Sequence, residues 1–281
     1  MPNSYKIVSD SSSNLFSLAD VAYQSVPLKI ICGDMQYVDD QSLDVESMID
    51  ALKVTKNRSG TSCPNVNDWL SAFEGHDRIF AITITGSLSG SWSTAMKARE
   101  QYLDAHPDAR IHIIDSLSTG PEMALIIERL RRGILDGMEF DALAEDITHY
   151  QEHTRLLFCL QSLNNLARNG RISAVKAKVM GALGLRIVGR ASEQGTLQPL
   201  HKARGEEKAV ACVVDEMVNM GYNGGRVRIS YCRSLGAAKK IAATVAARFP
   251  DAPKAVLEPC TALCSFYAEE GGYIVGFEID G

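Results

Sequence analysis

Residues 78–90 read RIFAITITGSLSG, and this stretch decides the fold. Residues 78–84 are mostly apolar, which predicts a buried strand. A polar loop with two glycines follows at 85–90, and a helix is expected from about 91 to 103. A buried strand that runs through a polar loop into a helix is the unit from which parallel α/β sheets are built.

The same order of strand, polar loop and helix occurs on either side of this stretch. The strand expected at 6–10 continues into a serine-rich loop at 11–14 and a helix at 15–24. The strand expected at 110–114 continues into a loop at 115–120 and a further helix. This repetition predicts a parallel sheet and gathers the three loops at its carboxyl edge, where open α/β folds bind ligands. Between these units we expect a strand at 26–31, a turn at 33–34, a helix at 44–55, a loop at 60–64 and a helix at 67–73.

The rhythm changes near residue 151. Two helices are expected at 163–168 and 173–183, followed by strands at 185–188 and 197–201 that flank a turn at 193–195. The remainder is expected to hold a helix at 206–220, a strand at 226–231, a helix at 237–249 and a strand at 273–277. The sequence therefore predicts two α/β domains, an N-terminal one at 1–153 with a parallel sheet and a C-terminal one at 154–281.

Composition excludes several classes of protein. Apolar residues make up 46% and charged residues 22% of the chain, as in an ordinary globular protein, and the net charge of −5 does not favour nucleic-acid binding. No stretch approaches the ~18 apolar residues of a membrane span, so we expect no stable membrane insertion. The start of the chain lacks the apolar core of a secretion signal, and the seven cysteines are scattered without a C-x-x-C pair. These features predict a cytoplasmic protein with reduced thiols.

Most catalytic motifs fail when they are tested against this chain. The segment 86–90 resembles a nucleophile elbow, but Leu88 stands where the elbow needs serine. There is no phosphate-binding P-loop and no G-x-G-x-x-G. His149 and His153 share a helix face, but no third ligand motif accompanies them, so no metal site is expected. We therefore expect no metal and no cofactor.

Three loops rich in hydroxyl groups remain as candidate binding elements, at 9–13, 61–62 and 86–91. Hydroxyl and backbone N–H groups at helix starts suit the binding of a carboxylate or phosphate. The alternative is that these residues only form turns and helix caps. Asp10 and Asp115 are the acidic residues near these loops, and we expect both to cap or organise the loops through hydrogen bonds rather than to act as bases.

These loops also carry a resemblance to the DegV family of bacterial fatty-acid-binding proteins. The matching segments run in order along the chain and are SDSSSNL at 9–15, VPL at 26–28 with YVD at 37–39, TSCP at 61–64, SLSGSW at 87–92, DSLSTG at 115–120, NGRIS at 169–173 and AR at 203–204. The family patterns they resemble include T-D-S-T-S-D-L, T-S-Q-P, S-x-L-S-G-T-Y and G-G-R-I-S. Each segment alone is weakly specific, whereas the ordered set is specific.

The resemblance implies a fold and a site. It implies a two-domain α/β protein that holds a long-chain fatty acid between its domains, with the carboxylate bound by Thr61 and Ser89. Beside them we expect Ser87 and Gly90, and around them a supporting layer formed by Ser9, Asp10, Ser11, Ser118, Arg204 and Tyr267. It also implies a carrier that presents the acyl carboxylate to an ATP-dependent kinase and does no chemistry itself. The alternative is an enzyme, a transferase or hydrolase acting on a small phosphorylated or acylated substrate in the same cleft.

One segment departs from the family pattern. The family usually ends in H-T-G-P-G, with its histidine near the carboxylate, whereas residues 267–271 read YAEEG. Like charges repel in a shielded site, so either Glu269 and Glu270 point away from the head group or the ligand differs. We expect Tyr267 to leave lipid binding intact and to impair transfer to the kinase.

Residues 153–192 contain no acidic residue. Seven basic residues lie within this stretch, namely Arg155, Arg168, Arg171, Lys176, Lys178, Arg186 and Arg190. They can be solvated charges balanced by the acidic remainder, or they can form a docking patch for an acidic or phosphate-bearing partner. Arg168 and Arg171 flank the turn at 169–170, so we expect both to project from the surface and to dock the partner.

Overall fold

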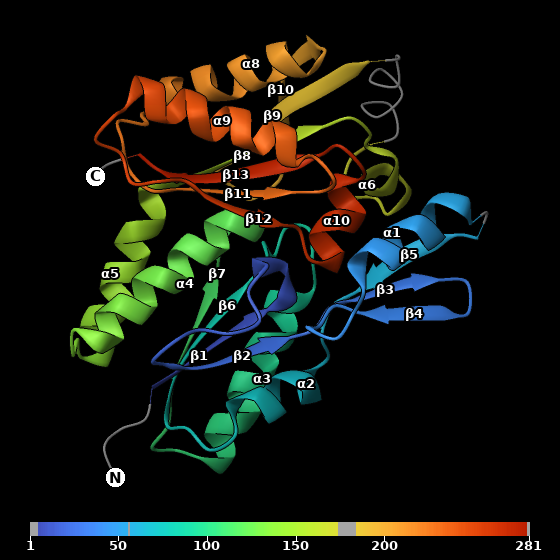
Figure 1. Ribbon diagram of the computed structural model, residues 1–281. Coiled ribbons are helices and arrows are strands. Elements are labelled where there is room, and N and C mark those ends of the chain that lie inside the picture. The colour runs from blue at the N-terminus through green and yellow to red at the C-terminus, as the bar shows by residue number, and fades with distance from the viewer. Residues whose placement is uncertain (1–4, 56, 174–183, 280–281) are drawn as a thin grey trace.

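The computed structural model describes residues 5–55, 57–173 and 184–279. The strands form three sheets, of four, six and three strands. Figure 1 shows the six-stranded sheet above the four-stranded sheet, with the three-stranded sheet to one side. This mixed α/β architecture, with a parallel sheet in the N-terminal half, confirms the predicted fold class.

The four-stranded sheet is parallel throughout and has the order β2-β1-β6-β7. Its strands are β1 (Tyr5–Asp10), β2 (Ala22–Val26), β6 (Arg78–Thr83) and β7 (Arg110–Asp115). Four helices cover it, namely α2 (Val66–Phe73), α3 (Ser91–Ala105), α4 (Gly120–Leu135) and α5 (Phe140–Glu152). In β6, Ile79 and Ala81 pack with α2 and α3 on one face, and Phe80 and Ile82 pack with α4 and α5 on the other. Burial on both faces explains why this strand is a continuous apolar run.

The segment after β1 differs from the sequence prediction. We expected a helix at 15–24, but the chain forms a 3₁₀ turn, η1 (Ser11–Ser13), and then enters β2, which pairs with β1. The helix prediction was wrong because a short helix gains little stability without tertiary packing, and pairing with the sheet edge decides the structure here.

The three-stranded sheet is antiparallel, with the order β4-β3-β5. Its strands are β3 (Lys29–Cys32), β4 (Met35–Val38) and β5 (Ser59–Ser62), and α1 (Val45–Val54) follows β4. The expected loop at 60–64 is therefore partly a strand, in which Thr61 lies opposite Ile30 of β3. Sequence reasoning missed β5 because its residues are small and polar and show no apolar alternation.

The six-stranded sheet has the order β10-β9-β8-β13-β11-β12 and is antiparallel except for the pair β11 and β12. Its strands are β8 (Thr154–Leu160), β9 (Leu185–Ala191), β10 (Leu197–Arg204), β11 (Val227–Tyr231), β12 (Val256–Pro259) and β13 (Tyr273–Glu278). The helices α8 (Glu206–Asn219) and α9 (Leu235–Arg248) cover its outer face. Sequence reasoning missed β8 and β12. The helix expected at 173–183 lies outside the described residues from 174 onward.

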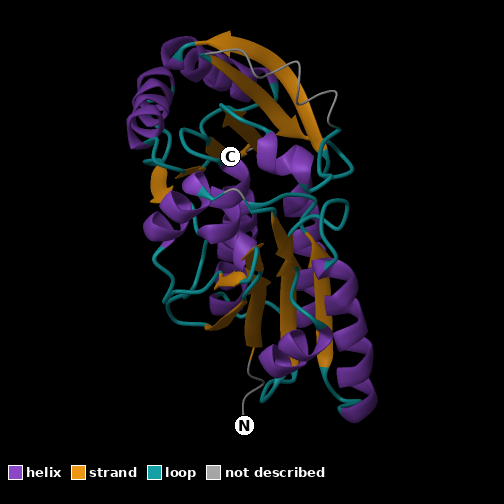
Figure 2. Cartoon of the chain, turned by 90° about the vertical axis from the view of Figure 1, so that its right-hand side faces the viewer, coloured by secondary structure: helices purple, strands orange, loops and turns teal. Residues whose placement is uncertain are grey.

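The inner face of this sheet lies opposite the carboxyl ends of the parallel strands, whose arrows run toward it in Figure 2. Leu156, Phe158 and Leu160 of β8 lie on this inner face, alternating with Leu157 and Cys159 on the outer face. Beneath the sheet, α4 packs across β13 and β11, and α10 (Ala262–Ala268) packs against α6 (Asn164–Arg168). The six-stranded sheet begins at residue 154, while the division into domains at 153 and 154 stays a prediction.

Candidate functional site

A cavity of about 280 Å³ lies between the two halves of the molecule. Its lower wall comes from the loops after β6 and β7, and its upper wall comes from the inner face of the six-stranded sheet. Most of the lining is apolar, and the larger apolar side chains are Leu28, Ile84, Leu88, Leu117, Leu156, Phe158, Leu160, Leu166, Leu197, Leu263 and Ile274. A cavity lined in this way suits the hydrocarbon part of a ligand.

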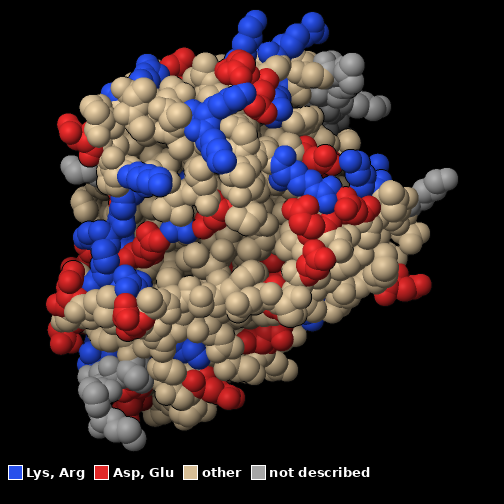
Figure 3. Space-filling view, in the orientation of Figure 1, with Lys and Arg blue, Asp and Glu red and all other residues tan. Residues whose placement is uncertain are grey.

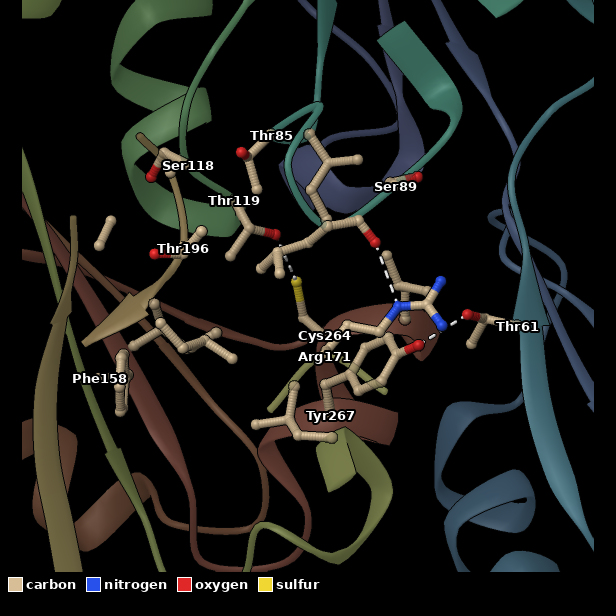
Figure 4. A pocket seen from close by; sticks show the side chains of 18 of the residues that line it. Thr61, Thr85, Ser89, Ser118, Thr119, Phe158, Arg171, Thr196, Cys264 and Tyr267 are labelled. Carbon is tan, nitrogen blue, oxygen red and sulfur yellow. Dashed lines mark hydrogen bonds between the residues drawn. The ribbon is translucent and has the colours of Figure 1, made fainter. Parts of the chain in front are cut away.

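One end of the cavity is polar. There the hydroxyl oxygens of Thr61 and Tyr267 lie 2.7 Å apart, in hydrogen-bonding distance. Figure 4 shows Thr61, Tyr267 and Arg171 together at this end and Phe158 and Thr196 toward the opposite end. Polar groups gathered at one end of an apolar cavity fix the orientation of a ligand that has one polar end.

Electrostatics makes this end suitable for an anion. Among the lining residues in the described ranges, Arg171 has the only charged side chain. Its Nε donates a hydrogen bond to the backbone oxygen of Leu88 at 3.1 Å, which holds the guanidinium in place. Burial raises the pKa of the Tyr267 phenol, so this group stays neutral and can donate a hydrogen bond. One fixed positive charge beside neutral hydroxyl donors favours a carboxylate or phosphate.

The backbone brings Thr61, Ser89 and Gly90 together. Thr61 is held in β5 by its pairing with β3, while Ser89 and Gly90 form the turn before α3. A Cβ atom at Gly90 would lie 3.1 Å from Sγ of Cys63, so glycine allows the strand segment and the turn to approach closely. All three residues line the cavity. The structure thus brings together three residues that we expected to bind the head group, and their role in binding stays a prediction.

Ser87 and Arg204, two residues expected near the head group, do not line the cavity. The hydroxyl of Ser87 donates a hydrogen bond to the backbone oxygen of Gln194 at 2.5 Å and does not line the cavity. Arg204 is exposed at the end of β10 and is also absent from the lining. Ser118 does line the cavity, but Figure 4 shows it away from Thr61. A place for Ser87 and Arg204 around the head group stays a prediction.

Ser9, Asp10 and Ser11 form a buried layer behind the site. Asp10 accepts hydrogen bonds from the backbone N–H of Ile84 at 2.9 Å and from the hydroxyl of Ser91 at 2.5 Å. Ser11 accepts one from the backbone N–H of Leu28 at 3.0 Å, and none of the three residues lines the cavity. Burial raises the pKa of Asp10 although its hydrogen bonds act in the opposite direction. These residues hold the loops in place, as we expected for Asp10.

Arg171 is a correction to the sequence analysis. We expected it to project from the surface with Arg168, but it is half-buried and lines the polar end of the cavity. Arg168, in the last turn of α6, is exposed. The resemblance of residues 169–173 to a family motif was the signal that could have placed Arg171 at the site. Lys176 and Lys178 of the basic stretch lie outside the described residues.

The two acidic residues after Tyr267 point away from the cavity. The carboxylate of Glu269 accepts a hydrogen bond from the backbone N–H of Asn165 at 3.0 Å, and Glu270 forms an ion pair with Lys53 at 2.8 Å. Neither residue lines the cavity. Figure 3 shows acidic and basic side chains side by side on the surface over α1, where the Glu270 pair lies. Of our two alternatives, the structure supports the one in which this loop faces away from the head group.

The described part of the chain contains neither a candidate metal site nor a helix that could span a membrane. Within residues 5–55, 57–173 and 184–279, no group of three or more His, Cys, Asp and Glu side chains is placed to hold a metal ion. Over the same ranges, no helix has the length and apolar character needed to cross a bilayer.

Comparison with known proteins places the chain in a family. Residues 4–278 match the model of the DegV family, which is described as a family of uncharacterised proteins. A DegV domain-containing protein of Streptococcus pneumoniae is 44% identical over 280 residues, which cover 98% of this chain and 99% of that protein. The crystal structure of the Streptococcus pneumoniae Fatty Acid Kinase (Fak) B3 protein loaded with linoleic acid matches with a TM-score of 0.96 and 43% identity, over 99% of this chain and 100% of that chain. A DegV family protein from Eubacterium eligens loaded with heptadecanoic acid matches with a TM-score of 0.95 and 38% identity, over 98% and 99% of the two chains. The chain therefore belongs to the DegV family.

Proposed function

We propose that this chain binds one long-chain fatty acid in the cavity. The carboxylate lies at the polar end, where it takes hydrogen bonds from Thr61 and Ser89 and faces the guanidinium of Arg171. The acyl tail lies along the inner face of the six-stranded sheet, toward Phe158. The observation that carries this proposal is the polarity of the cavity, with its one fixed positive charge beside hydroxyl donors at one end and a mostly apolar lining elsewhere, in which neutral hydroxyl groups are the other polar side chains.

The tail supplies most of the affinity in this account. Each buried methylene contributes about 0.8 kcal/mol, so a long acyl chain contributes on the order of 10 kcal/mol before the cost of ordering it. The head group contributes orientation, because a carboxylate placed among apolar side chains would lose its hydrogen bonds to water. Two solved relatives that are 43% and 38% identical hold linoleic acid and heptadecanoic acid, which supports a ligand of this class.

We further propose that the chain is a carrier that presents the carboxylate to an ATP-dependent kinase. The similarity to a protein named as part of a fatty acid kinase supports this partner. The polar end offers hydrogen-bond donors rather than a strong base. Asp10 and Asp115 lie outside the lining and accept hydrogen bonds from the backbone of the loops, and burial raises the pKa of the Cys264 thiol to about 12. These observations favour a carrier over the alternative of an enzyme in the same cleft.

The working compartment in this proposal is the cytoplasm. All seven cysteines are free thiols in the structure, and five of them are buried. Reduced thiols without disulfides fit a reducing compartment.

Native mass spectrometry of the protein purified from cells tests the proposed ligand. We expect the wild-type protein to carry the mass of one fatty acid. Ala191 lines the cavity, so Ala191→Phe should fill part of it and reduce the bound fraction. Ala246→Phe on the exposed side of α9 is the matched control and should keep the ligand. An empty wild-type protein that turns over a phosphoester would support the enzyme alternative instead.

A further inference from the structure

Asp39 is a fully buried carboxylate that caps a helix from a distant part of the chain. It lies directly after β4, yet its Oδ1 accepts a hydrogen bond from the backbone N–H of Ala262 at 2.8 Å and its Oδ2 accepts one from Leu263 at 3.1 Å. These N–H groups belong to the first turn of α10, where helices leave donors without internal partners. The residue before the helix, Thr261, does not cap it, because its hydroxyl donates to Asn14 at 2.8 Å instead.

The helix that Asp39 caps carries part of the polar end of the cavity. Leu263, Cys264, Tyr267 and Ala268 of α10 line the cavity, and Tyr267 reaches the hydroxyl of Thr61. Figure 1 shows α10 between the six-stranded sheet and α1. The position of the Tyr267 phenol therefore depends on how firmly the start of α10 is held.

Asp39 is also tied to the sheet that holds Thr61. Its backbone N–H donates to the backbone oxygen of Leu28 at 2.9 Å, one residue before β3. β3 pairs with β5 and places Thr61 opposite Ile30. Asp39 thus connects α10, which carries the Tyr267 hydroxyl, to the three-stranded sheet, which carries the Thr61 hydroxyl.

We propose that Asp39 is a positioning residue of the head-group site, whose carboxylate holds α10 so that Tyr267 meets Thr61, and whose protonation weakens fatty-acid binding. This inference rests on the proposed function. A neutral carboxyl group keeps one good acceptor and gains a donor, so it cannot accept strong hydrogen bonds from both Ala262 and Leu263. The first turn of α10 then loses part of its attachment, and Tyr267 moves relative to Thr61.

The surroundings of Asp39 allow this protonation near neutral pH. Burial raises the pKa of Asp39 to about 6, although hydrogen bonds from Ser11, Leu263, Ala262 and Thr261 act in the opposite direction. Within the described ranges, no Lys, Arg or His forms an ion pair with Asp39.

Among the described residues, the thiols of Cys260 and Cys264 interact electrostatically with Asp39, and Asp10 and Glu258 are further acidic groups that act on Cys264. Burial raises the pKa of both thiols, which therefore stay neutral, and it also raises the pKa of Asp10. An experiment must therefore separate the titration of Asp39 from that of Asp10.

The sign of the linkage distinguishes this effect from unfolding. A carboxyl group whose pKa is raised in the folded state binds a proton more tightly there than in the unfolded chain. As the pH falls through about 6, protonation of Asp39 therefore favours the folded state. As the pH falls, affinity for the fatty acid should therefore decrease, whereas the contribution of Asp39 to thermal stability should not decrease.

The test compares fatty-acid affinity across pH in three proteins, with thermal stability measured in parallel. The probe is a fluorescent long-chain fatty acid displaced by oleate, between about pH 5 and about pH 8. Wild-type affinity should fall about tenfold toward the acid end, the loss expected for one hydrogen bond to a charged group. Asp39→Asn should bind weakly across the whole range and show a flatter profile.

Asp44→Asn is the matched control, because Asp44 caps α1 in a similar way, accepting from Ser47 N–H at 3.1 Å, but on the surface. It should follow the wild-type curve, including any change due to titration of the fatty acid itself or of Asp10.

A second variant keeps the test decisive if Asp39→Asn does not fold. Tyr267→Phe removes the hydroxyl through which Asp39 acts, so its affinity should be lower and its pH profile flatter than those of the wild type. The inference about Asp39 is wrong if the wild-type protein binds fatty acid and Asp39→Asn keeps the wild-type pH profile. If Asp39→Asn does not fold, a wild-type pH profile in Tyr267→Phe has the same meaning. If the wild-type protein binds no fatty acid at any pH, the proposed function is wrong.

Discussion

Replacing Thr61 by valine removes one hydroxyl from the polar end of the cavity and keeps the branched shape of the side chain. The hydroxyl lies 2.7 Å from that of Tyr267 and is proposed to donate to the carboxylate. Loss of a hydrogen bond to a charged group costs about 1.5–3 kcal/mol, which corresponds to a weakening of roughly ten- to 150-fold. Because Thr61 is in a short strand whose backbone pairing does not need the hydroxyl, thermal stability should change little.

The assay is competitive displacement of a fluorescent fatty acid, read together with thermal unfolding. Ser89→Ala should also weaken binding about tenfold or more, because its hydroxyl is the second proposed donor. Thr244→Val is the matched control, since the hydroxyl of Thr244 donates to the backbone of α9 on the outer face and lies far from the cavity. The head-group assignment fails if both Thr61→Val and Ser89→Ala keep the affinity of the wild type.

Three further predictions address the partner and the fold. The wild-type protein should bind lipid but should support acyl phosphate formation by a kinase of the family type at less than full rate. Tyr267→His combined with Glu269→Gly and Glu270→Pro restores the family pattern and should raise that rate, whereas a full rate in the wild-type protein would contradict the prediction. Arg168→Glu should slow association with the partner strongly at low salt and weakly at high salt, since salt screens exposed charges over about 8–10 Å, and should spare fatty-acid affinity, whereas Arg171→Glu should weaken fatty-acid binding. Gly195→Ala should lower thermal stability more than Gly137→Ala, because both have positive φ but only at Gly195 would a Cβ meet another atom at 2.1 Å; equal losses would show that the hairpin moves freely.

The sequence predicts the fold well where apolar patterns are local. The run at 78–84 indicates β6, and its repetition around 6–10 and 110–114 correctly predicts a parallel sheet. The errors lie where distant contacts decide the structure. Within and just after the expected helix at 15–24, residues 22–26 form a strand because they pair with β1, and residues 59–62 form a strand because they pair with β3.

In the candidate site, too, local patterns predict some residues, whereas contacts between distant parts of the chain place the others. Thr61, Ser89 and Gly90 could be expected from hydroxyl-rich loops and a family resemblance, and the structure brings them together. The contact between Thr61 and Tyr267 joins residues 206 positions apart, so no local pattern reveals it. Arg171 was assigned to the surface because charge along a sequence does not show which way a side chain points. Its hydrogen bond to Leu88, 83 positions away, turns it into the cavity.

A crystal structure of the protein with a bound fatty acid would show directly which groups hold the carboxylate. We expect the carboxylate to lie within hydrogen-bonding distance of the Thr61 and Ser89 hydroxyls and to face Arg171, with the tail along the inner face toward Phe158. A fatty acid bound outside this cavity, or bound with its methyl end at Thr61 and its carboxylate elsewhere, would contradict this expectation.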